Sequence, residues 1–361
     1  MRSWRSVRMV SLLMLWIGCG GLIGGCWDYH DINHRAMPVI MGIGQGENKA
    51  YQVYLQIPIP AEQKLVIKVV SSEADTVSEA VDQIRMSIEN YIDLLSVEMV
   101  VIHQSIAEQG LREALSNAIR SRNMSPKALI AITDSDMKRL LSNSKQAVNN
   151  DVTTFYKFAN KRAGWTPKTA KTTMMEAFAS TRSYTEDVLI PIIRPGDDTV
   201  LSFAGSAVMR QGKMVDRMNA EETLLVNVVT NRYYGAAVEV LSDTSVTIKS
   251  AHMKWRSRLN GQGAEMNGRL SIQATLTETK SDNPKSEIVK ELTALLEREL
   301  GQLMKKLKNS GSDPLGLGNY YRDKIPFEKL QRWRSDYYPS ANITYSVKVK
   351  INNYGSLMQR E

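Results

Sequence analysis

The sequence predicts a multi-domain protein of mixed α/β and α+β class, in which helices cover β-sheets in an unusual topology. Three observations predict it. The 361 residues exceed one average domain. An apolar fraction of 43% with 23% charged residues is ordinary for a folded globular chain. Strand-like runs alternate with helix signals in the first half, and a long amphipathic helix stands out in the C-terminal half.

The chain opens with three arginines followed by an apolar stretch, residues 9–23, that is shorter than the 20 or so residues of a membrane-spanning helix. The stretch ends in Leu22-Ile23-Gly24-Gly25-Cys26, which resembles the lipobox of bacterial lipoproteins. This resemblance implies that residues 1–25 are a signal peptide and that Cys26 carries a covalent diacylglyceryl lipid. Residues 26–37 would then form a lipidated tether. Two or more acyl chains hold a protein on a membrane stably.

Two alternatives apply to this segment. Cys19 is a competing lipid site, but Trp16 stands where a lipobox has a Leu-like residue. An uncleaved N-terminal anchor helix is the other reading. Cys19 and Cys26 are the only cysteines, so a chain beginning at Cys26 can form no internal disulfide.

Residues 38–195 are predicted to form an N-terminal α/β region, as one unit or two subdomains. Capping-box patterns at Thr76 and Ser105 predict helices, and Asp134 or Ser135 is expected to cap a third that ends near Leu141. The strand-like runs are residues 38–43, 51–57, 65–70, 97–103 and 128–132. Strand and helix alternating in this way predict a βαβ unit with a partly parallel sheet.

The segment from Asn143 to Thr185 is polar and helical in character. After it, Pro191–Asp198 contains two prolines and a Gly-Asp turn, which leave little room for regular structure. The sequence therefore favours a domain boundary there, with a C-terminal α/β domain over residues 196–361.

In this C-terminal part, the runs 201–210 and 213–218 flank Gln211-Gly212 and predict a hairpin. A short helix (220–228) and strands (237–240, 245–250 and 269–277) are expected to follow. The strongest helix begins at Pro284, after the cap candidate Asn283, and ends before Gly311; its apolar stripe is expected to cover a sheet built from the runs at 201, 245, 269 and 343. Residues 343–351 alternate apolar and polar, which predicts a half-buried antiparallel strand.

Candidate chemistry is sparse. Ser142-Asn143-Ser144-Lys145 with Ser281-Asp282-Asn283 fits two of the three motifs of a penicillin-binding-type serine acyltransferase, and the Lys-Thr-Gly element is absent. His30 and His34 have a metal-compatible spacing but lie in the tether, with only His103 and His252 as further histidines. Gly42 to Gly46 lacks the following helix that a phosphate site needs. These patterns favour no catalytic residues, no metal and no cofactor.

Charge argues against nucleic acid. Losing the three N-terminal arginines lowers the net charge from +8 to +5, which is mild. The densest basic run, Lys305-Lys306 with Lys308, closes a helix, where cations favour the negative end of the dipole.

Three stretches together resemble the Ger(x)C family, the lipoprotein C subunits of spore germinant receptors. They are Gly25-Cys26-Trp27-Asp28 with Asp31-Ile32-Asn33, then Phe203 to Met209 with Gly212 to Val215 and Glu222, and finally Asp313-Pro314-Leu315-Gly316-Leu317-Gly318 with Trp333, Tyr337, Tyr338 and the last strand. Two departures are small: Asp31 stands where Glu is usual, and Met218 where Leu commonly follows a Gly. The resemblance covers almost the whole chain after Cys26.

The resemblance implies a non-enzymatic receptor subunit, lipid-anchored on the outer face of the inner spore membrane. It would act with a membrane-embedded A subunit and a permease-like B subunit to trigger germination in response to nutrients. Two other classes stay open: a solute-binding lipoprotein of a transporter and an envelope serine acyltransferase. A solute-binding protein would need two similar lobes, and the halves of this sequence look unlike each other.

Overall fold

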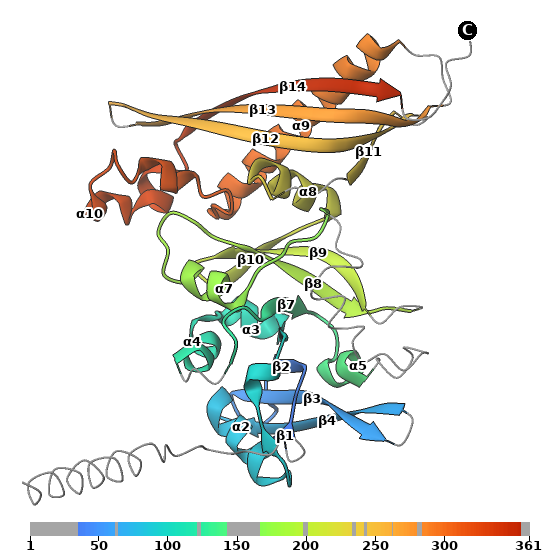
Figure 1. Cartoon of the computed structure of the whole chain (residues 1–361). Helices are drawn as coiled ribbons and strands as arrows, with labels where there is room; N and C mark the ends of the chain where they lie inside the picture. Colours follow the sequence, from blue (N-terminus) through green and yellow to red (C-terminus); the bar gives the residue numbers. More distant parts are fainter. Residues whose placement is uncertain are drawn as a thin grey trace, which may run out of the picture. The chain divides into compact units, whose positions relative to one another are not determined.

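The computed structural model describes residues 35–61, 64–120, 124–142, 167–197, 201–232, 236–241, 244–261, 263–279 and 284–354. The chain divides into a first unit, Met1–Arg35, and a compact unit, Ala36–Glu361. The compact unit holds two large sheets and the helices that cover them (Figure 1). Among the residues just given, no helix is both long and apolar enough to span a bilayer.

The larger sheet has eight strands in the order β10-β9-β8-β7-β6-β2-β3-β4. Its strands are β2 (Ile40–Gly44), β3 (Tyr51–Ala61), β4 (Lys64–Ala74), β6 (Met99–His103), β7 (Leu129–Thr133), β8 (Leu189–Pro195), β9 (Leu201–Arg210) and β10 (Lys213–Met218). The four central strands, β2, β6, β7 and β8, run parallel to their neighbours within this group. The predicted partly parallel sheet is therefore confirmed, and so is the hairpin of β9 and β10.

Parallel strands are usually buried on both faces, and the central strands here are almost continuous apolar runs. On one face, α2 (Val77–Met86), α4 (Arg112–Arg120) and α7 (Met174–Ser180) contribute to one apolar cluster. On the other face, α5 (Met137–Ser142) packs through Met137, Leu140 and Leu141. The short elements β1 (Arg35–Ala36), β5 (Tyr91–Ile92) and η2 (Leu94–Ser96) lie outside this sheet.

Helix starts partly match the predicted caps. Thr76 caps α2, accepting a hydrogen bond from the Glu79 amide at 3.2 Å. The cap of α5 is Asp136, which accepts from the Arg139 amide at 2.6 Å. The expectation of Asp134 or Ser135 is wrong, because the Asp134 carboxylate is held by two arginines from other strands.

The helix predicted from Ser105 onward is two helices. The first, α3 (Gln104–Gln109), begins directly after β6, so His103 and not Ser105 occupies the cap position. Gly110 then breaks the helix at φ 134°, a conformation that other residues rarely adopt. The break lets the Leu111 amide donate to the Gly212 carbonyl in the β9–β10 turn at 2.8 Å, and α4 follows.

Two predictions about the middle of the chain also change. Of Asn143–Thr185, residues 143–166 lie outside the described residues, and in the remainder only α7 is helical. The expectation that Pro191–Asp198 is irregular is wrong, because Pro191 to Pro195 belong to β8, which pairs with β7 and β9. The domain boundary proposed at residue 195 stays a prediction. The strands on its two sides, β8 and β9, are neighbours in the eight-stranded sheet.

The smaller sheet has four strands in the order β11-β12-β13-β14. They are β11 (Ala236–Leu241), β12 (Thr244–Asn260), β13 (Gly263–Thr279) and β14 (Asn342–Tyr354). The strands β12 and β13 are far longer than predicted. The last strand pairs with β13 in parallel, so the antiparallel prediction is wrong. The reason is the intervening helix, which returns the chain to the start of the sheet as a crossover.

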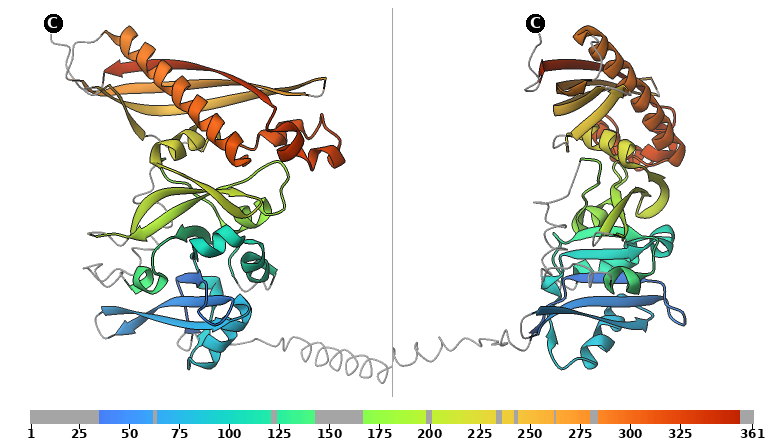
Figure 2. Two further views of the ribbon diagram at one scale, coloured as in Figure 1. Left: turned by 180° about the vertical axis from the view of Figure 1, so that it is seen from behind. Right: turned by 90° about the vertical axis from the view of Figure 1, so that its right-hand side faces the viewer.

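That helix is α9 (Lys285–Ser310), and the predicted amphipathic helix is confirmed. Pro284 takes the cap position without a side-chain hydrogen bond, while Asn283 lies outside the described residues. Seven apolar side chains of α9 are buried against the four-stranded sheet: Ile288, Leu292, Leu296, Leu300, Leu303, Met304 and Leu307. The run at Leu201 is not part of that sheet; it forms β9 of the larger one. Figure 2 shows α9 lying along one face of strands β12–β14.

The remaining helices are α8 (Ala220–Val229), η4 (Leu317–Tyr321), α10 (Phe327–Leu330) and the π-helical turn η5 (Trp333–Tyr337). Asn219 caps α8 with a full capping box to Glu222. These elements share one apolar cluster with α9, the four-stranded sheet and residues of β9 such as Val208. The two sheets therefore meet in a continuous core.

Candidate functional site

A buried polar cluster joins the two sheets next to this core. We call Asp187, Asp313, Trp333 and Arg334 the polar junction. Asp187 lies just before β8 and is 1% exposed, whereas Asp313 lies between α9 and η4 and is fully buried. Carboxylates are almost never buried without partners, so the hydrogen-bond partners of Asp187 and Asp313 show which segments the junction connects.

Asp187 links three distant segments. Its Oδ1 accepts from the Gln211 amide at 2.8 Å, and its Oδ2 accepts from the Asp313 amide at 2.9 Å. The Arg334 guanidinium completes the set, with Nε 2.9 Å from Oδ2 and Nη2 2.8 Å from Oδ1. This bidentate ion pair fixes the orientation of the two side chains and also neutralises the buried charge.

Arg334 also clamps the loop before β8. Its Nη1 donates to the carbonyls of Ser183 and Tyr184 at 2.9 and 2.7 Å, and its Nη2 donates to the carbonyl of Glu186 at 3.1 Å. A single guanidinium thus binds one carboxylate and three carbonyls. A lysine has three donors and no planar fork, so it could not reproduce this set.

Asp313 organises the turn that carries the last motif. Its Oδ1 accepts from the Leu317 amide at 3.0 Å, and its Oδ2 accepts from the Gly318 amide at 2.9 Å and from Trp333 Nε1 at 3.0 Å. Burial raises the pKa of the Asp313 carboxyl to about 6, although the three donors act in the opposite direction.

Gly318 is required by close approach. A Cβ at this position would lie 2.8 Å from Trp333 Nε1 and 2.9 Å from the Thr185 Cα. Trp333 itself is 1% exposed and packs against Tyr321, with ring centroids 5.0 Å apart. The Gly-rich turn and the Trp helix therefore lock together through Asp313.

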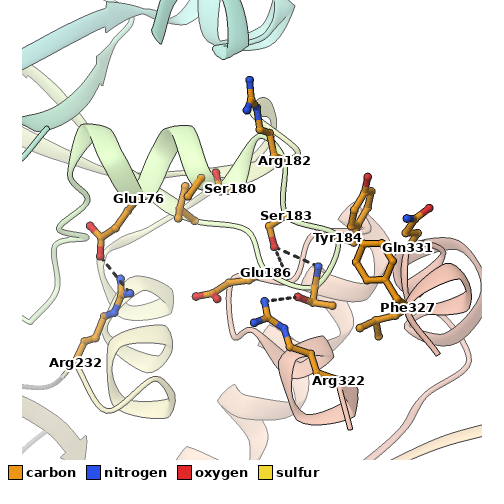
Figure 3. A pocket seen from close by; sticks show the side chains of 14 residues that line it. Glu176, Ser180, Arg182, Ser183, Tyr184, Glu186, Arg232, Arg322, Phe327 and Gln331 are labelled. Carbon is orange, nitrogen blue, oxygen red and sulfur yellow. Dashed lines mark hydrogen bonds and ion pairs between the residues drawn. The ribbon is translucent and has the colours of Figure 1, made fainter. Parts of the chain in front are cut away.

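A cavity of about 650 Å³ opens beside the junction (Figure 3). Its walls include the clamped loop, and they carry both charges and aromatic rings. On one side, Arg232 Nη2 lies 3.5 Å from Glu176 Oε1. On the other side, the rings of Tyr184 and Phe327 pack edge to face. The remaining charged walls are Arg182, Arg322 and Glu186.

These groups suit binding better than catalysis. Among the described residues that line the cavity, none is a His or a Cys. The Ser180 hydroxyl donates to the Ala177 carbonyl, and the Ser183 hydroxyl oxygen accepts from the amides of Thr185 and Glu186, so neither is paired with a general base. Arginine donors beside an aromatic edge can hold an anionic group next to an apolar one.

A second polar cluster lies where the parallel strands β7 and β8 end. Asp134 accepts from Arg194 of β8 at 2.6 and 2.8 Å and from Arg217 of β10 at 3.0 Å. The Arg194 guanidinium holds the pKa of the Asp134 carboxyl well below its usual range. The cluster ties the hairpin to the parallel strands.

Comparison with known proteins identifies the family. Residues 28–195 match the family described as "Spore germination protein N-terminal domain". Residues 204–355 match the family described as "Spore germination B3/ GerAC like, C-terminal". Together these two matches span most of the chain.

The chain belongs to the GerAC-like spore germination proteins. It is 23% identical to spore germination protein GerQC of Bacillus cereus, over 78% of this chain and 82% of that one. It is 21% identical to spore germination protein KC of Bacillus subtilis (strain 168), over 97% of both chains. The crystal structure of the GerBC protein matches with a TM-score of 0.58 and 15% identity, over 87% of this chain and 97% of that one, which shows the shared fold.

The structure gives the GerAC-like motifs a physical role. Asp313, Gly318, Trp333 and Tyr338 were singled out by the resemblance, and all four lie in or against the polar junction. The sequence did not single out Asp187 or Arg334. The only available signal was that Arg334 follows Trp333 directly. Asp187 and Arg334 lie 147 positions apart, so no local sequence pattern links them.

The other candidate residues are scattered. Cys26, His30 and His34 lie outside the described residues, as do Asn143 to Lys145 and Ser281 to Asn283. Ser142 is the last residue of α5. His103 caps α3 and His252 lies on β12, and the described residues contain no group of three or more potential metal ligands. Gly42 and Gly44 belong to β2, so of the glycines in this run only Gly46 lies outside the strand.

Proposed function

We propose that this spore germination protein is the lipid-anchored, non-enzymatic C subunit of a nutrient germinant receptor, needed for nutrient-triggered germination. The observation that carries the proposal is the match of both family domains, one after the other, to a single chain. The first of these matches begins two residues after the lipobox cysteine, Cys26.

The proposal places the diacylglyceryl lipid on Cys26 and the folded unit on the outer face of the inner spore membrane. No other cofactor is required. Ten residues from Cys26 to Arg35 separate the lipid from the compact unit, a reach of at most about 35 Å when extended.

The proposed partners are the membrane-embedded A subunit and the permease-like B subunit. The side chains of the polar junction and of the cavity support a role in binding these partners. The described residues offer a stiff polar junction and a cavity without an activated nucleophile, which suit an assembly role. A solute-binding protein of two similar lobes finds no support, because one sheet has eight strands and the other four.

The anchor is tested by labelling. Cys26→Ala should leave a precursor that keeps residues 1–25 and incorporates no labelled fatty acid, whereas Cys19→Ala should be labelled normally. Undiminished label on Cys26→Ala would remove the lipid-anchor assignment.

The receptor role is tested in spores. Affinity capture of the tagged chain from detergent-solubilised spore membranes should co-purify two integral membrane proteins in a fixed ratio. Spores lacking the chain should fail to germinate with the receptor's nutrient but respond normally to a receptor-independent trigger. Normal nutrient germination of spores that contain no other receptor would contradict the proposal.

A further inference from the structure

One face of the four-stranded sheet is covered by α9 and the other is not. Outward side chains on β12, β13 and β14 alternate with the buried ones, and no described element lies over them. In Figure 1 these strands lie in front of α9, and in the view from behind in Figure 2 the helix lies in front of them. The face turned away from α9 is called the open sheet face below.

The open sheet face is strongly cationic. Its exposed charged side chains come from three strands: Lys254, Arg256 and Arg258 of β12, Arg269 of β13, and Lys348 and Lys350 of β14. The only carboxylate among the described side chains of this face is Glu265, whose Oε1 accepts from Asn260 at 3.2 Å. The exposed side of α9, in contrast, mixes Glu287 and Glu297 with its lysines.

The strand register places one pair of these cations directly opposite each other, whereas Arg258 lies opposite Glu265. Lys254 lies directly opposite Arg269, and Lys348 lies opposite Ser271, the next outward residue of β13. Like charges directly across a strand pair destabilise a sheet. None of the six cations has a salt-bridge partner among the described residues. The arrangement costs stability in the isolated protein, which indicates a use outside it.

The rest of the face decides what kind of partner fits. Between the cations lie Ser, Thr, Asn and Gln, with His252, and no aromatic or aliphatic side chain points outward from the described part of these strands. Protein interfaces depend on buried aromatic or aliphatic anchors, and single-stranded nucleic acids need aromatic rings to stack on. Neither is present. Over roughly 26 Å along the strands and about 10 Å across them, the face offers only spaced positive charges and small polar groups.

We propose that the open sheet face binds the headgroups of an anionic phospholipid bilayer. Spaced cations on a flat polar surface match the spread phosphate charge of such a membrane. The proposal rests on the proposed function only in that an anchored chain stays close to a membrane. Contact through the face would fix the C-terminal domain against the lipid surface.

The test uses the full chain, purified from membranes with detergent and reconstituted into lipid nanodiscs. With Cys19 replaced by Ser, Ser271→Cys places one fluorophore at the centre of the face, and Lys290→Cys places it on the exposed side of α9 in a matched sample. Discs contain headgroup-quencher lipid in either phosphatidylcholine or a phosphatidylcholine–phosphatidylglycerol mixture. Quenching at position 271 should appear only with phosphatidylglycerol, and it should be lost at high salt.

Charge reversal supplies the control. The triple variant Lys254→Glu/Arg269→Glu/Lys348→Glu should weaken the contact by at least about a hundredfold, since the loss of each cation near an anionic surface costs about fivefold and the new carboxylates are repelled. Lys285→Glu/Lys290→Glu/Lys305→Glu, on the other side of the domain, should change it little. Circular dichroism and melting of each variant show that it is folded.

Three results would overturn the proposal: equal quenching in both lipids, equal loss in both triple variants, or no quenching at 271 while the chain stays in washed discs. If the face variant instead lost co-purifying receptor subunits with quenching unchanged, the face would bind an acidic protein. A chain that washes out of phosphatidylcholine discs at high salt would point to failure of the anchor, which is a failure of the proposed function and not of the face.

Discussion

Two regions of the compact unit are stabilised by opposite chemistry. Between α9 and the four-stranded sheet, seven apolar side chains are buried. In the polar junction, Asp187, Asp313 and Arg334 hold together a loop, a turn and a π-helical segment. The first region needs shape and volume, whereas the second needs particular donors and acceptors. Apolar contacts tolerate exchange of similar residues, whereas a buried ion pair does not tolerate the loss of one partner.

The largest effect is expected at the junction. Arg334→Ala leaves the Asp187 carboxylate buried without its cation and removes the donors of three carbonyls, so the free energy of unfolding should fall by about 3–5 kcal/mol. Urea denaturation measures it. Arg332→Ala, two residues away on the surface, removes an exposed pair with Asp336 and should cost less than about 1 kcal/mol. Similar losses of stability in both variants would contradict the claim that Arg334 contributes more to stability than an exposed arginine.

A slightly smaller effect is expected under α9. Leu296 is 4% exposed and lies in the middle of the apolar stripe, so Leu296→Ala should cost about 2–5 kcal/mol through the cavity that it leaves. Leu296→Met, which nearly conserves volume, should cost less than about 1.5 kcal/mol. Equal midpoints for the alanine variant and the native chain would indicate that α9 is not packed on the sheet.

The pH dependence of the free energy of unfolding distinguishes the two regions further. The pKa of Asp313 is about 6 in the folded chain and about 3.9 when unfolded, so the folded state binds more protons between these values. The contribution of Asp313 to stability is therefore fully present below about pH 4, declines as the pH rises to 6, and is constant above it. Relative to Asp313→Asn, the native chain should lose about 3 kcal/mol across this window. A difference that does not vary with pH would contradict the raised pKa.

The smallest effect is expected on the exposed side of α9. Lys290→Ala should change the free energy of unfolding by less than about 0.5 kcal/mol, as surface changes usually do. A loss comparable to that of Leu296→Ala would show that this side of the helix is covered.

The two regions also differ in how far sequence predicts them. The apolar stripe of α9 and the Gln211-Gly212 hairpin are visible because their residues are close in sequence and repeat with the period of the element. The sequence pattern predicts β12 only as far as Ser250 and β13 only from Arg269. Beyond Ser250 the apolar pattern is interrupted by Lys254, Arg256 and Arg258, and lysine is uncommon in strands. Their alternation with Trp255 and Leu259 was the missed signal.

The junction could not be assembled from one sequence. Asp187 looks like any acid ahead of an apolar run, and its burial depends on Arg334, 147 residues later. The resemblance singled out Asp313 and Trp333 but said nothing of what they contact. Only the fold shows that this motif meets the loop before β8.

A double-mutant cycle between Asp187 and Arg334 tests the central claim most directly. Asp187→Ala, Arg334→Ala and the double variant are compared with the native chain by urea denaturation. Because the side chains share two close contacts and are almost fully buried, the cycle should give a coupling of about 2–3 kcal/mol. A coupling of zero, with the two losses simply additive, would contradict the claim that this pair joins the C-terminal motif to the eight-stranded sheet.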